Sequence, residues 1–394
     1  MVDFTLPTEI VDLSARVRSF VAEKIVPYES DPRMTAHGPT EDLRSELVAL
    51  AKADGLLSLQ APQAFGGRGL THLEQAAIFE AAGWSPLGPT ALNFAAPDEG
   101  NMLLLNKVAN PAQKEQWLRP MAEGRYRSCF SMTEPGGAGA DPSLLRTQAR
   151  RAGDGFLING RKWLITGAIG ARFTIIMADV VPDEEHPAGP TMFLAPMDAE
   201  GINICRQMNS IDKSFTGGHA EIEFSDVFVP ADSVLGAIGE GFRYAQVRLA
   251  PARVTHCMRW LGGACRVNEV AIDFANHRQA FGKIIGEHEG VGFMLADNAI
   301  DIETSRLAIW KAAWLLDQGS QARHESSLTK VFVSEALFRI ADRCVQILGG
   351  QGLTDDTPAA WLFQELRAFR IYDGPSETHR WAMAKRILKG AQAK

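Results

Sequence analysis

The sequence predicts a mainly helical protein with a β domain in its middle, in the order helical, β, helical. Three observations lead to this fold class. Apolar residues recur at helical spacing through the first 125 residues or so, the next 110 or so form short apolar runs, and the helical period then returns. We therefore expect domains at residues 1–125, 126–235 and 236–394.

The N-terminal domain is predicted to be a helical bundle. Residues 8–24 place their apolar side chains on one helical face: Ile10, Leu13, Val17, Phe20 and Val21. Residues 41–56 and 71–84 have the same period. Pro111 can occupy the first turn of a further helix over residues 111–123.

The middle domain is predicted to be built of roughly six to eight strands. Its short apolar runs are separated by Gly, Pro and Asp and lie at residues 126–133, 156–165, 172–181 and 190–196. Residues 220–225 alternate between apolar and polar side chains, as a half-buried strand does. The Asn159-Gly160 dipeptide predicts a hairpin turn between two strands.

The last third of the chain is predicted to be a second helical bundle. Two sets of apolar residues each share one helical face: Val267, Val270, Ala271 and Phe274, and then Leu337, Ile340, Ala341, Cys344 and Leu348. Residues 290–318 are apolar-periodic and nearly free of helix breakers.

Composition excludes several classes of protein. The 394 residues include 40 basic and 47 acidic side chains, for a net charge of −7, which argues against a nucleic-acid binder. No run approaches the length of a membrane span, and the N-terminus lacks the basic and apolar regions of a secretory signal. Five cysteines make no disulfide framework, so we expect a reducing, cytoplasmic compartment and core positions for Cys129, Cys205 and Cys344.

Most familiar catalytic motifs are missing. The chain has no Rossmann or P-loop glycine motif, no Cys-x-x-Cys, no His-Glu-x-x-His and no Gly-x-Ser-x-Gly. The spacing of His256, Cys257 and Cys265 matches none of the usual zinc patterns, so no metal site is predicted.

Two segments of the middle domain could bind a ligand. In residues 130–141 a strand leads into a turn containing Gly136, Gly137 and Gly139, whose backbone N–H groups could approach an anion closely. An ordinary turn capped by Asp141 explains this turn equally well. In residues 159–167, Trp163 and Thr166 could pack on and hydrogen-bond a flat ring, although a core Trp and an exposed Thr are the simpler interpretation.

A third segment, residues 346–374, could carry a general base. An apolar helix ends in a glycine cluster, a second helix follows, and Asp373 then stands before Gly374 amid apolar residues. Partial desolvation there would raise the pKa of a carboxyl toward that of a useful base. An ordinary turn Asp is the plainer alternative.

Together these segments resemble the acyl-CoA dehydrogenase family over essentially the whole chain. The matching motifs are Thr-Glu-Pro at residues 133–135, Ile-Thr-Gly at 165–167, Arg-Gln-Ala-Phe-Gly-Lys at 278–283, and Gln346 with the glycine cluster at 349–352. The resemblance implies an N-terminal helical bundle, a middle β domain and a C-terminal four-helix bundle.

The resemblance also implies FAD as cofactor. In the family, the isoalloxazine is held by strands matching Met132-Thr133 and residues 164–166, with Thr133 and Thr166 as hydrogen-bond partners. The full set of cofactor-binding positions implied here is Phe130, Met132, Thr133, Gly139, Ala140, Leu164, Ile165, Thr166, Arg278, Phe281, Gln346, Gly349, Gly350, Pro375 and Glu377. The family binds the pyrophosphate and adenosine end largely from a neighbouring subunit, so the resemblance implies a homodimer or homotetramer with a shared FAD site.

The implied catalytic residues are Asp373 and Arg253. The family's base is a Glu after an Ile-Tyr pair and before Gly, and this chain has Asp373 there, with an arm about 1.5 Å shorter. Some members carry the Glu instead at the position of Ala252, which cannot act as a base. Arg253 matches a family arginine near the active site.

The reaction implied is α,β-dehydrogenation of an acyl-CoA thioester to the trans-2-enoyl-CoA, as in fatty acid β-oxidation, with electrons passed to an electron-transfer flavoprotein. Because the α-proton is very weakly acidic, hydrogen bonds to the thioester carbonyl must stabilise the developing enolate. In the family these come from a flavin ribityl hydroxyl and the backbone N–H of the base residue, here Asp373.

The chain departs from the family pattern at several positions. The turn after Thr-Glu-Pro is one residue longer, Ala140 replaces a serine, Pro375 replaces a threonine, and Gln364-Glu365 replace an Arg-Asp pair. The longer turn, the Asp base and residues 253–259 resemble the subgroup that includes members fused to kinase-like domains.

Two other functions compete with the dehydrogenase. A nitroalkane oxidase of the same superfamily uses Asp at the position of Asp373, removes a proton from a carbon acid and passes electrons to O₂. A non-catalytic relative would bind flavin that no acyl-CoA could bleach.

Overall fold

The computed structural model describes residues 5–183 and 187–392, which form two compact units. A helical unit contains the described residues up to Glu29, the segment Leu70–Pro89, and the chain from Ala250 onward. A β-containing unit comprises Ser30–Gly69 and Thr90–Leu249. The predicted order of helical, β and helical segments along the chain is confirmed, while the domain boundaries at residues 125 and 235 stay predictions.

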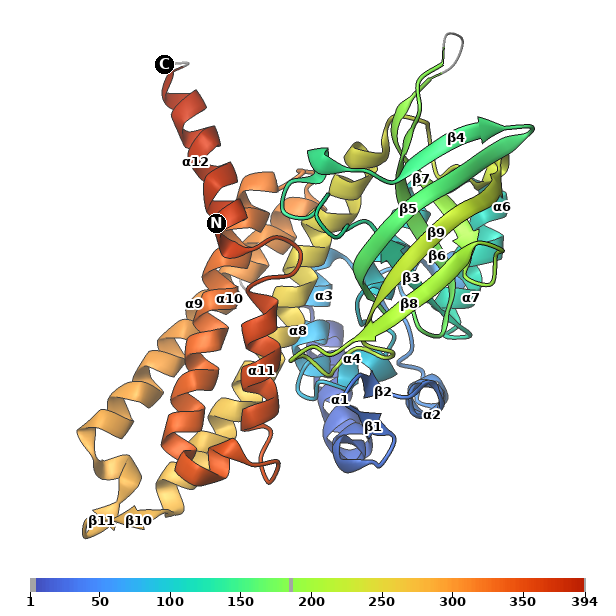
Figure 1. Ribbon diagram of the computed structural model, residues 1–394. Helices are drawn as coiled ribbons and strands as arrows, with labels where there is room; N and C mark the ends of the chain where they lie inside the picture. The colour runs from blue at the N-terminus through green and yellow to red at the C-terminus, as the bar shows by residue number, and fades with distance from the viewer. Residues whose placement is uncertain (1–4, 184–186, 393–394) are drawn as a thin grey trace. The chain divides into compact units, whose positions relative to one another are not determined.

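The helical unit consists mainly of long helices, seen in Figure 1. Their bounds are α1 (Thr8–Phe20), α3 (His72–Ala82), α8 (Gly241–His277, of which the part from Ala250 belongs here), α9 (Glu289–Asp317), α10 (Arg323–Leu348), α11 (Ala359–Phe369) and α12 (Ser376–Gln392). The strands β10 (Gln279–Ala280) and β11 (Lys283–Ile284) form a small hairpin between α8 and α9. Helix α10 packs against α9, α11 and α12.

Two glycines let α3 and α8 approach closely within this unit. A Cβ built on Gly83 would lie 1.7 Å from the carbonyl oxygen of Arg259, and one on Gly262 would lie 2.0 Å from that of Glu80. Neither position can hold a side chain without separating the two backbones.

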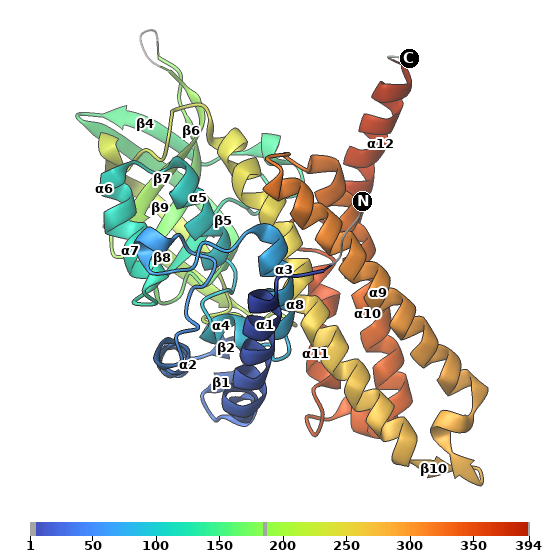
Figure 2. The same ribbon diagram turned by 180° about the vertical axis from the view of Figure 1, so that it is seen from behind.

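The β-containing unit is built around a mixed sheet, which Figure 2 shows from behind. Its strands in the described part of the chain are β3 (Arg127–Ser131), β4 (Gln148–Ala152), β5 (Gly155–Thr166), β6 (Ala171–Val180), β7 (Gly189–Pro196), β8 (Ile202–Met208) and β9 (His219–Pro230). They lie in the order β3-β6-β4-β5-β9-β8, and β7 also pairs with β6. Strand β6 runs parallel to β3 and β4, and the other pairs are antiparallel.

Short helices and a second hairpin complete this unit. They are β1 (Met34–Thr35), β2 (Gly38–Pro39), α2 (Glu41–Ala53), α5 (Asp98–Val108), α6 (Pro111–Gln113) and α7 (Arg119–Ala122). The short α4 (Gly88–Ala91) crosses from one unit to the other along the chain. Two apolar cores form here: one joins β6 and β7 to α5 and α7, and the other lies between β5, β6, β7 and β9.

The predicted N-terminal helices are present, with recognisable ends. Helix α1 continues into a π-helical turn at Val21–Ile25. The hydroxyl of Thr40 caps α2, and Thr71 and Glu74 form a reciprocal capping box at α3. Pro111 occupies the first turn of α6, as its missing N–H allows.

The predicted hairpin at Asn159-Gly160 is wrong. Both residues lie inside β5, at a shift in its pairing with β9. The glycine is needed because a Cβ there would lie 2.4 Å from the hydroxyl oxygen of Thr147. The Asn159 amide donates to the Asp226 carboxylate at 2.8 Å. The turn between β4 and β5 instead contains Gly153, whose φ is +56°.

The core prediction for cysteine is wrong at Cys205. Cys129 and Cys344 are buried, but Cys205 is exposed because β8 forms an edge of the sheet and its five central residues are all exposed. All five cysteines are free. Among the helices that the structure describes, none has a stretch long and apolar enough to cross a bilayer.

Candidate active site

The structure brings together the two middle-domain segments that the sequence singled out. The backbone N–H of Trp163 donates to the carbonyl of Thr133 at 3.1 Å. The hydroxyl of Thr133 donates back to the carbonyl of Trp163 at 2.6 Å. The end of β3 and the second half of β5 are therefore joined by a reciprocal pair of hydrogen bonds.

A buried ion pair lies behind this junction. The ammonium of Lys162 donates to the carbonyl of Met132 at 3.0 Å and to the Glu134 carboxylate at 2.8 Å. Both side chains are almost completely buried. Glu134 also accepts hydrogen bonds from the backbone and hydroxyl of Thr147, at 2.9 and 2.6 Å. This carboxylate therefore holds the Thr-Glu-Pro turn against the strand that follows it.

The environment shifts the pKa of both partners. Burial lowers the pKa of Lys162 to about 8, against the opposing charge of Glu134. Burial opposes ionisation of Glu134, but the charge and hydrogen bonds of Lys162 and Thr147 outweigh it and hold the pKa of that carboxyl below its ordinary value. The sequence analysis missed Lys162. The available signal was weak, because Lys162 stands beside the exposed Arg161 in the same strand.

Leu164 is the most unusual residue of β5. Its φ is +52°, a left-handed conformation that costs a side-chain-bearing residue free energy. Its side chain is 47% exposed, whereas the neighbouring Ile165 is buried. Phe130 and Met132 are half-buried against the apolar core of the unit. Strained residues with exposed apolar side chains are typical of ligand-contact positions.

Thr166, at the end of β5, belongs to a chain of polar side chains. Its hydroxyl oxygen lies 3.0 Å from Nδ1 of His219, which stands opposite it in the pairing of β5 with β9. The other ring nitrogen of His219 lies 3.0 Å from the Asp212 carboxylate. The sequence analysis missed His219 and Asp212.

The turn that contains Gly136, Gly137 and Gly139 is followed by Asp141, which acts as a capping residue, as the interpretation of an ordinary turn predicts. Asp141 accepts from the backbone N–H and hydroxyl of Ser143, at 3.0 and 2.6 Å. Gly139 and Ala140 are exposed. The backbone N–H of Gly139 donates to the carbonyl of Asp141 over a long 3.4 Å. Anion binding by this turn stays a prediction.

Asp373 lies in a tight turn between α11 and α12 of the helical unit. Its φ is +53° and that of Gly374 is +102°. A Cβ on Gly374 would lie 2.6 Å from the imidazole of His379, so this position requires glycine. The carbonyl of Asp373 accepts from Arg253 Nε at 3.0 Å and lies 3.1 Å from His379 Nε2. The structure therefore joins the two predicted catalytic residues, through the main chain of Asp373.

His256 contacts the carboxylate of Asp373. Its Nε2 lies 3.4 Å from Oδ2 of Asp373, whose side chain is 20% exposed. Burial lowers the pKa of His256 to about 4, and the positive charge of Arg259 acts in the same direction, although Asp373 opposes both. His256 is therefore neutral near pH 7. Because a carboxylate only accepts hydrogen bonds, the ring proton belongs on Nε2.

A buried lysine completes this environment. Lys330 on α10 donates to the carbonyl of Phe369 at 2.5 Å and lies over the Phe369 ring at 4.4 Å. Burial lowers its pKa to about 8, and the nearby charge of Asp373 opposes this shift. The Trp260 indole donates to the hydroxyl of Tyr372, the residue before Asp373. Sequence reasoning noted His256 only as a metal-ligand candidate and missed Lys330.

The remaining predicted cofactor residues divide between the two ends of the helical unit. Arg278 directly precedes the short hairpin after α8, and Phe281, in the turn of that hairpin, is 95% exposed, whereas Gln346 is exposed near the end of α10. Figure 1 shows this hairpin at one end of the long helices and α12 at the other. Gln346 is 16 residues beyond Lys330, which is about 24 Å along α10.

The other predicted cofactor positions follow the same division. Gly349 and Gly350 lie directly after α10 and are exposed, whereas Pro375 and Glu377 lie at the start of α12, close to Asp373 in the chain. The structure therefore does not bring all of the predicted cofactor residues of the helical unit together.

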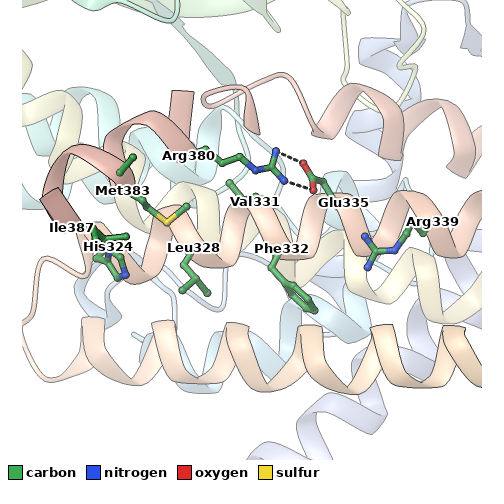
Figure 3. Close-up of a pocket in the computed structure, with 10 residues that line it drawn as sticks. His324, Leu328, Val331, Phe332, Glu335, Arg339, Arg380, Met383 and Ile387 are labelled. Carbon is green, nitrogen blue, oxygen red and sulfur yellow. Dashed lines mark hydrogen bonds and ion pairs between the residues drawn. The ribbon is translucent and has the colours of Figure 1, made fainter. Parts of the chain in front are cut away.

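A separate apolar groove lies between α10 and α12, drawn in Figure 3. Its apolar lining includes Leu328, Phe332 and Met383. The ion pair between Arg380 and Glu335, at 2.6 Å, ties the two helices together beside it. None of the described residues that line this groove is a predicted site residue. Within the described residues, no group of three or more His, Cys, Asp or Glu could hold a metal ion.

Three family models match the chain. The acyl-CoA dehydrogenase N-terminal domain matches residues 7–125, the middle domain matches residues 129–227, and the C-terminal domain matches residues 239–388.

Two curated relatives have similar sequences. "Probable acyl-CoA dehydrogenase FadE2" of Mycobacterium tuberculosis is 38% identical, over 98% of this chain and 97% of its own. Acyl-CoA dehydrogenase family member 11 of Gallus gallus is 34% identical over 94% of this chain and 49% of its own. The chain thus spans about half the length of that second relative.

Two solved structures have similar folds. One, assigned to the acyl-CoA dehydrogenases, comes from Mycobacterium abscessus, with a TM-score of 0.90, 36% identity, and coverage of 98% of this chain and 100% of that one. The other is butyryl-CoA dehydrogenase from Megasphaera elsdenii, with a TM-score of 0.87, 26% identity, and coverage of 98% and 100%.

Proposed function

The chain belongs to the acyl-CoA dehydrogenase family, and from this premise we propose that it is an FAD-dependent acyl-CoA dehydrogenase. It removes a proton from the α-carbon of an acyl-CoA thioester and a hydride from the β-carbon, which leaves the trans-2-enoyl thioester. The observation that carries this proposal is the Asp373 carboxylate, part-buried in a strained turn and contacted by His256.

The residues of the β-containing unit fit an isoalloxazine ring. Leu164 presents an exposed apolar side chain from a strained backbone, and Met132 is half-buried. The Thr133 hydroxyl uses its proton on Trp163, so its oxygen can still accept a hydrogen bond from a ring N–H. Apolar contact with a few placed polar groups is what a flat heteroaromatic ring requires. When bound, FAD supplies the two-electron acceptor that none of the amino-acid side chains can provide.

Asp373 acts as the general base in this proposal. Its carboxylate takes the α-proton, and the neutral His256 donates to Oδ2 and so orients the carboxylate plane. Arg253 fixes the main chain of the turn by its hydrogen bond to the carbonyl of Asp373. The partly buried setting excludes most of the water that would otherwise solvate the carboxylate, which favours proton transfer from a weak carbon acid.

We also propose that two copies of the chain share each FAD site, in a homodimer or homotetramer. Asp373 lies close enough to Lys330 for its charge to act on the lysine, whereas Gln346 lies about 24 Å beyond Lys330 along α10. One helical unit therefore does not gather both sets of residues around one ring. In addition, α9 exposes large apolar side chains at every seventh position: Phe293, Ile300, Leu307 and Trp314. Such a stripe is typical of a helix that packs against another helix.

An electron-transfer flavoprotein is the electron acceptor that we propose, on the basis of family membership. The length and branching of the acyl group depend on packing around the site, so a series of acyl-CoA esters is the suitable probe.

The test is anaerobic bleaching of the oxidised flavin band by acyl-CoA esters of increasing length. The wild-type holoprotein should be bleached by at least one ester. Asp373→Asn should retain FAD and lose the bleaching, because an amide cannot take the proton. The control is Asp356→Asn, an exposed Asp after α10, which should bleach like the wild type.

Two results would contradict the proposal. Normal bleaching of Asp373→Asn would remove Asp373 from the role of base. Oxygen uptake with a nitroalkane, without bleaching by any acyl-CoA, would assign the protein to nitroalkane oxidation instead.

A further inference from the structure

The main-chain carbonyl of Asp373 is held by side chains from two helices. Nε of Arg253, on α8, donates to this oxygen at 3.0 Å, and Nε2 of His379, in the first turn of α12, lies 3.1 Å from it. A carbonyl oxygen only accepts hydrogen bonds, so Nε2 of His379 carries a proton and donates. This direction does not depend on the charge of the ring, because a charged imidazole carries a proton on both nitrogens.

The turn that contains Asp373 needs such support because its backbone is strained. Asp373 has a φ of +53° and Gly374 a φ of +102°. A left-handed conformation is uncommon for a residue with a side chain, although Asp tolerates it better than most. Strained conformations persist only where the surrounding structure fixes them. The two hydrogen bonds fix the peptide that joins Asp373 to Gly374, and so the position from which the carboxylate projects.

The imidazole of His379 is itself held firmly. Its residue is only 4% exposed. A Cβ on Gly374 would lie 2.6 Å from Nε2, so the space that a side chain would take at this position is occupied by the ring. The backbone N–H of His379 donates to the carbonyl of Pro375 at 3.2 Å, which ties the residue to the start of α12. The first turn of α12 therefore packs directly on the Asp373 turn.

His379 contributes position to this site and not charge. Burial lowers the pKa of its imidazole to about 4, and the positive charge of Arg253 acts in the same direction, whereas the hydrogen bond to the Asp373 carbonyl opposes both. The ring is therefore neutral near pH 7. The charge of Arg253, in contrast, interacts with that of Asp373. Replacing His379 by a neutral residue thus changes the support of the turn and leaves the surrounding charges as they are.

We propose that His379 is a positioning residue for the general base, which holds the Asp373 turn in the conformation that presents the carboxylate to the α-carbon. This inference rests on the proposed function, because it takes Asp373 as the base. His379 acts through the main chain of Asp373, whereas His256 contacts the carboxylate itself.

Loss of this hydrogen bond should slow proton transfer more than it weakens substrate binding. His379→Leu keeps an apolar side chain in the buried space but donates no hydrogen bond. Because a misplacement of about 1 Å at a reacting group costs about 100-fold in rate, we expect this variant to lower the limiting rate of anaerobic flavin bleaching by about 10- to 100-fold. The acyl-CoA concentration that gives half of the limiting rate should be nearly unchanged.

His379→Gln is the rescue variant. A glutamine amide N–H can donate to the same carbonyl, so this variant should recover most of the wild-type rate. A residue that only filled space would give the opposite order, because Leu suits a buried site better than Gln does. The matched control is His277→Leu, at an exposed His of α8, which should bleach like the wild type.

The ring ¹⁵N NMR spectrum of His379 tests the geometry without flavin or substrate. The signal is identified by its loss in His379→Gln. The wild-type protein at pH 7 should show a protonated Nε2 at this residue. An unprotonated Nε2 would mean that the hydrogen bond to the Asp373 carbonyl does not form, and would overturn the proposal.

The outcomes separate this inference from the proposed function. If acyl-CoA bleaches the wild type but not Asp373→Asn, while His379→Leu bleaches at the wild-type rate, Asp373 remains the base and the positioning role is overturned. A His379→Gln variant as slow as His379→Leu has the same consequence. If His379→Leu does not fold, a slow Gln variant or an unprotonated Nε2 still overturns the inference. If no acyl-CoA bleaches the wild type, the proposed function fails, and the spectrum still decides whether His379 donates to the turn.

Discussion

Lys330, the buried lysine near Asp373, should make the stability of the protein depend on alkaline pH. Burial lowers its pKa from 10.5 to about 8. Each pH unit of this shift corresponds to about 1.4 kcal/mol, so holding the ammonium in the folded protein costs about 3 kcal/mol at pH 7. Replacing Lys330 by Met should remove this cost together with its pH dependence.

The sign follows from proton binding. Between pH 8 and pH 10.5 the unfolded lysine is protonated while the folded one is largely neutral, so the unfolded state binds more protons and stability rises with pH. About 2 to 3 kcal/mol of the cost should be recovered by pH 10 in the wild type, and none in Lys330→Met. Other groups titrate equally in both proteins, so their contributions cancel in the difference.

The assay is urea unfolding of the wild type and of Lys330→Met at pH 7 and pH 10. The free energy of unfolding of the wild type should increase relative to the variant by about 2 to 3 kcal/mol between the two pH values. The exposed Lys107, replaced by Met, provides a matched control that should show no such difference. A wild-type-minus-variant difference that is the same at both pH values would refute the assignment of a desolvated ammonium at Lys330.

Three further predictions concern the ion pair, the cofactor and the assembly. In a urea titration, Glu134→Gln should lower the free energy of unfolding by about 3 to 5 kcal/mol, because it leaves the buried Lys162 unpaired. The control, Asp198→Asn, removes one partner of an exposed ion pair and should lower the free energy of unfolding by less than about 1 kcal/mol. Arg278→Ala should weaken FAD retention at dilute protein, measured by flavin content after gel filtration. Arg278→Lys should only partly restore FAD retention, since the planar guanidinium suits phosphate oxygens. Unchanged flavin content in the Ala variant would count against a shared site. Ile300→Asp, in the exposed apolar stripe of α9, should shift the sedimentation pattern toward single copies of the chain, while Ile300→Leu should keep the wild-type pattern. An unaltered pattern in the Asp variant would mean that this stripe is not the interface between copies.

Local patterns predicted the kinds of element well, because periodicity reports which face of a segment is buried. Residues 290–318 were expected to form one helix, and α9 runs over Glu289–Asp317. The alternation at residues 220–225 lies within β9. The Asn159-Gly160 hairpin failed because the same dipeptide serves a turn or a shift in strand pairing, and only contact with Thr147 distinguishes the two.

The candidate site was predictable in part. The Thr-Glu-Pro and Ile-Thr-Gly segments stand out by composition, and the structure joins them at Thr133 and Trp163. Lys162 was missed because a single lysine in a strand looks like a solvent-facing residue until the carboxylate that pairs with it is known. Arg253 is 120 residues from Asp373, and no spacing rule connects positions so far apart.

The sequence by itself determined the order of helical and β segments, the family, and the identity of the groups that could take a proton or contact a ring. These properties depend on residue type and on neighbours within a few turns of helix or a single strand. Only the tertiary structure decided that a neutral His256 contacts Asp373, that Lys330 is buried nearby, and that His219 lies between Asp212 and the hydroxyl of Thr166. The pKa of a side chain and the direction of a hydrogen bond are set by burial and by partners distant in the chain, and packing alone brings those partners within a few ångströms.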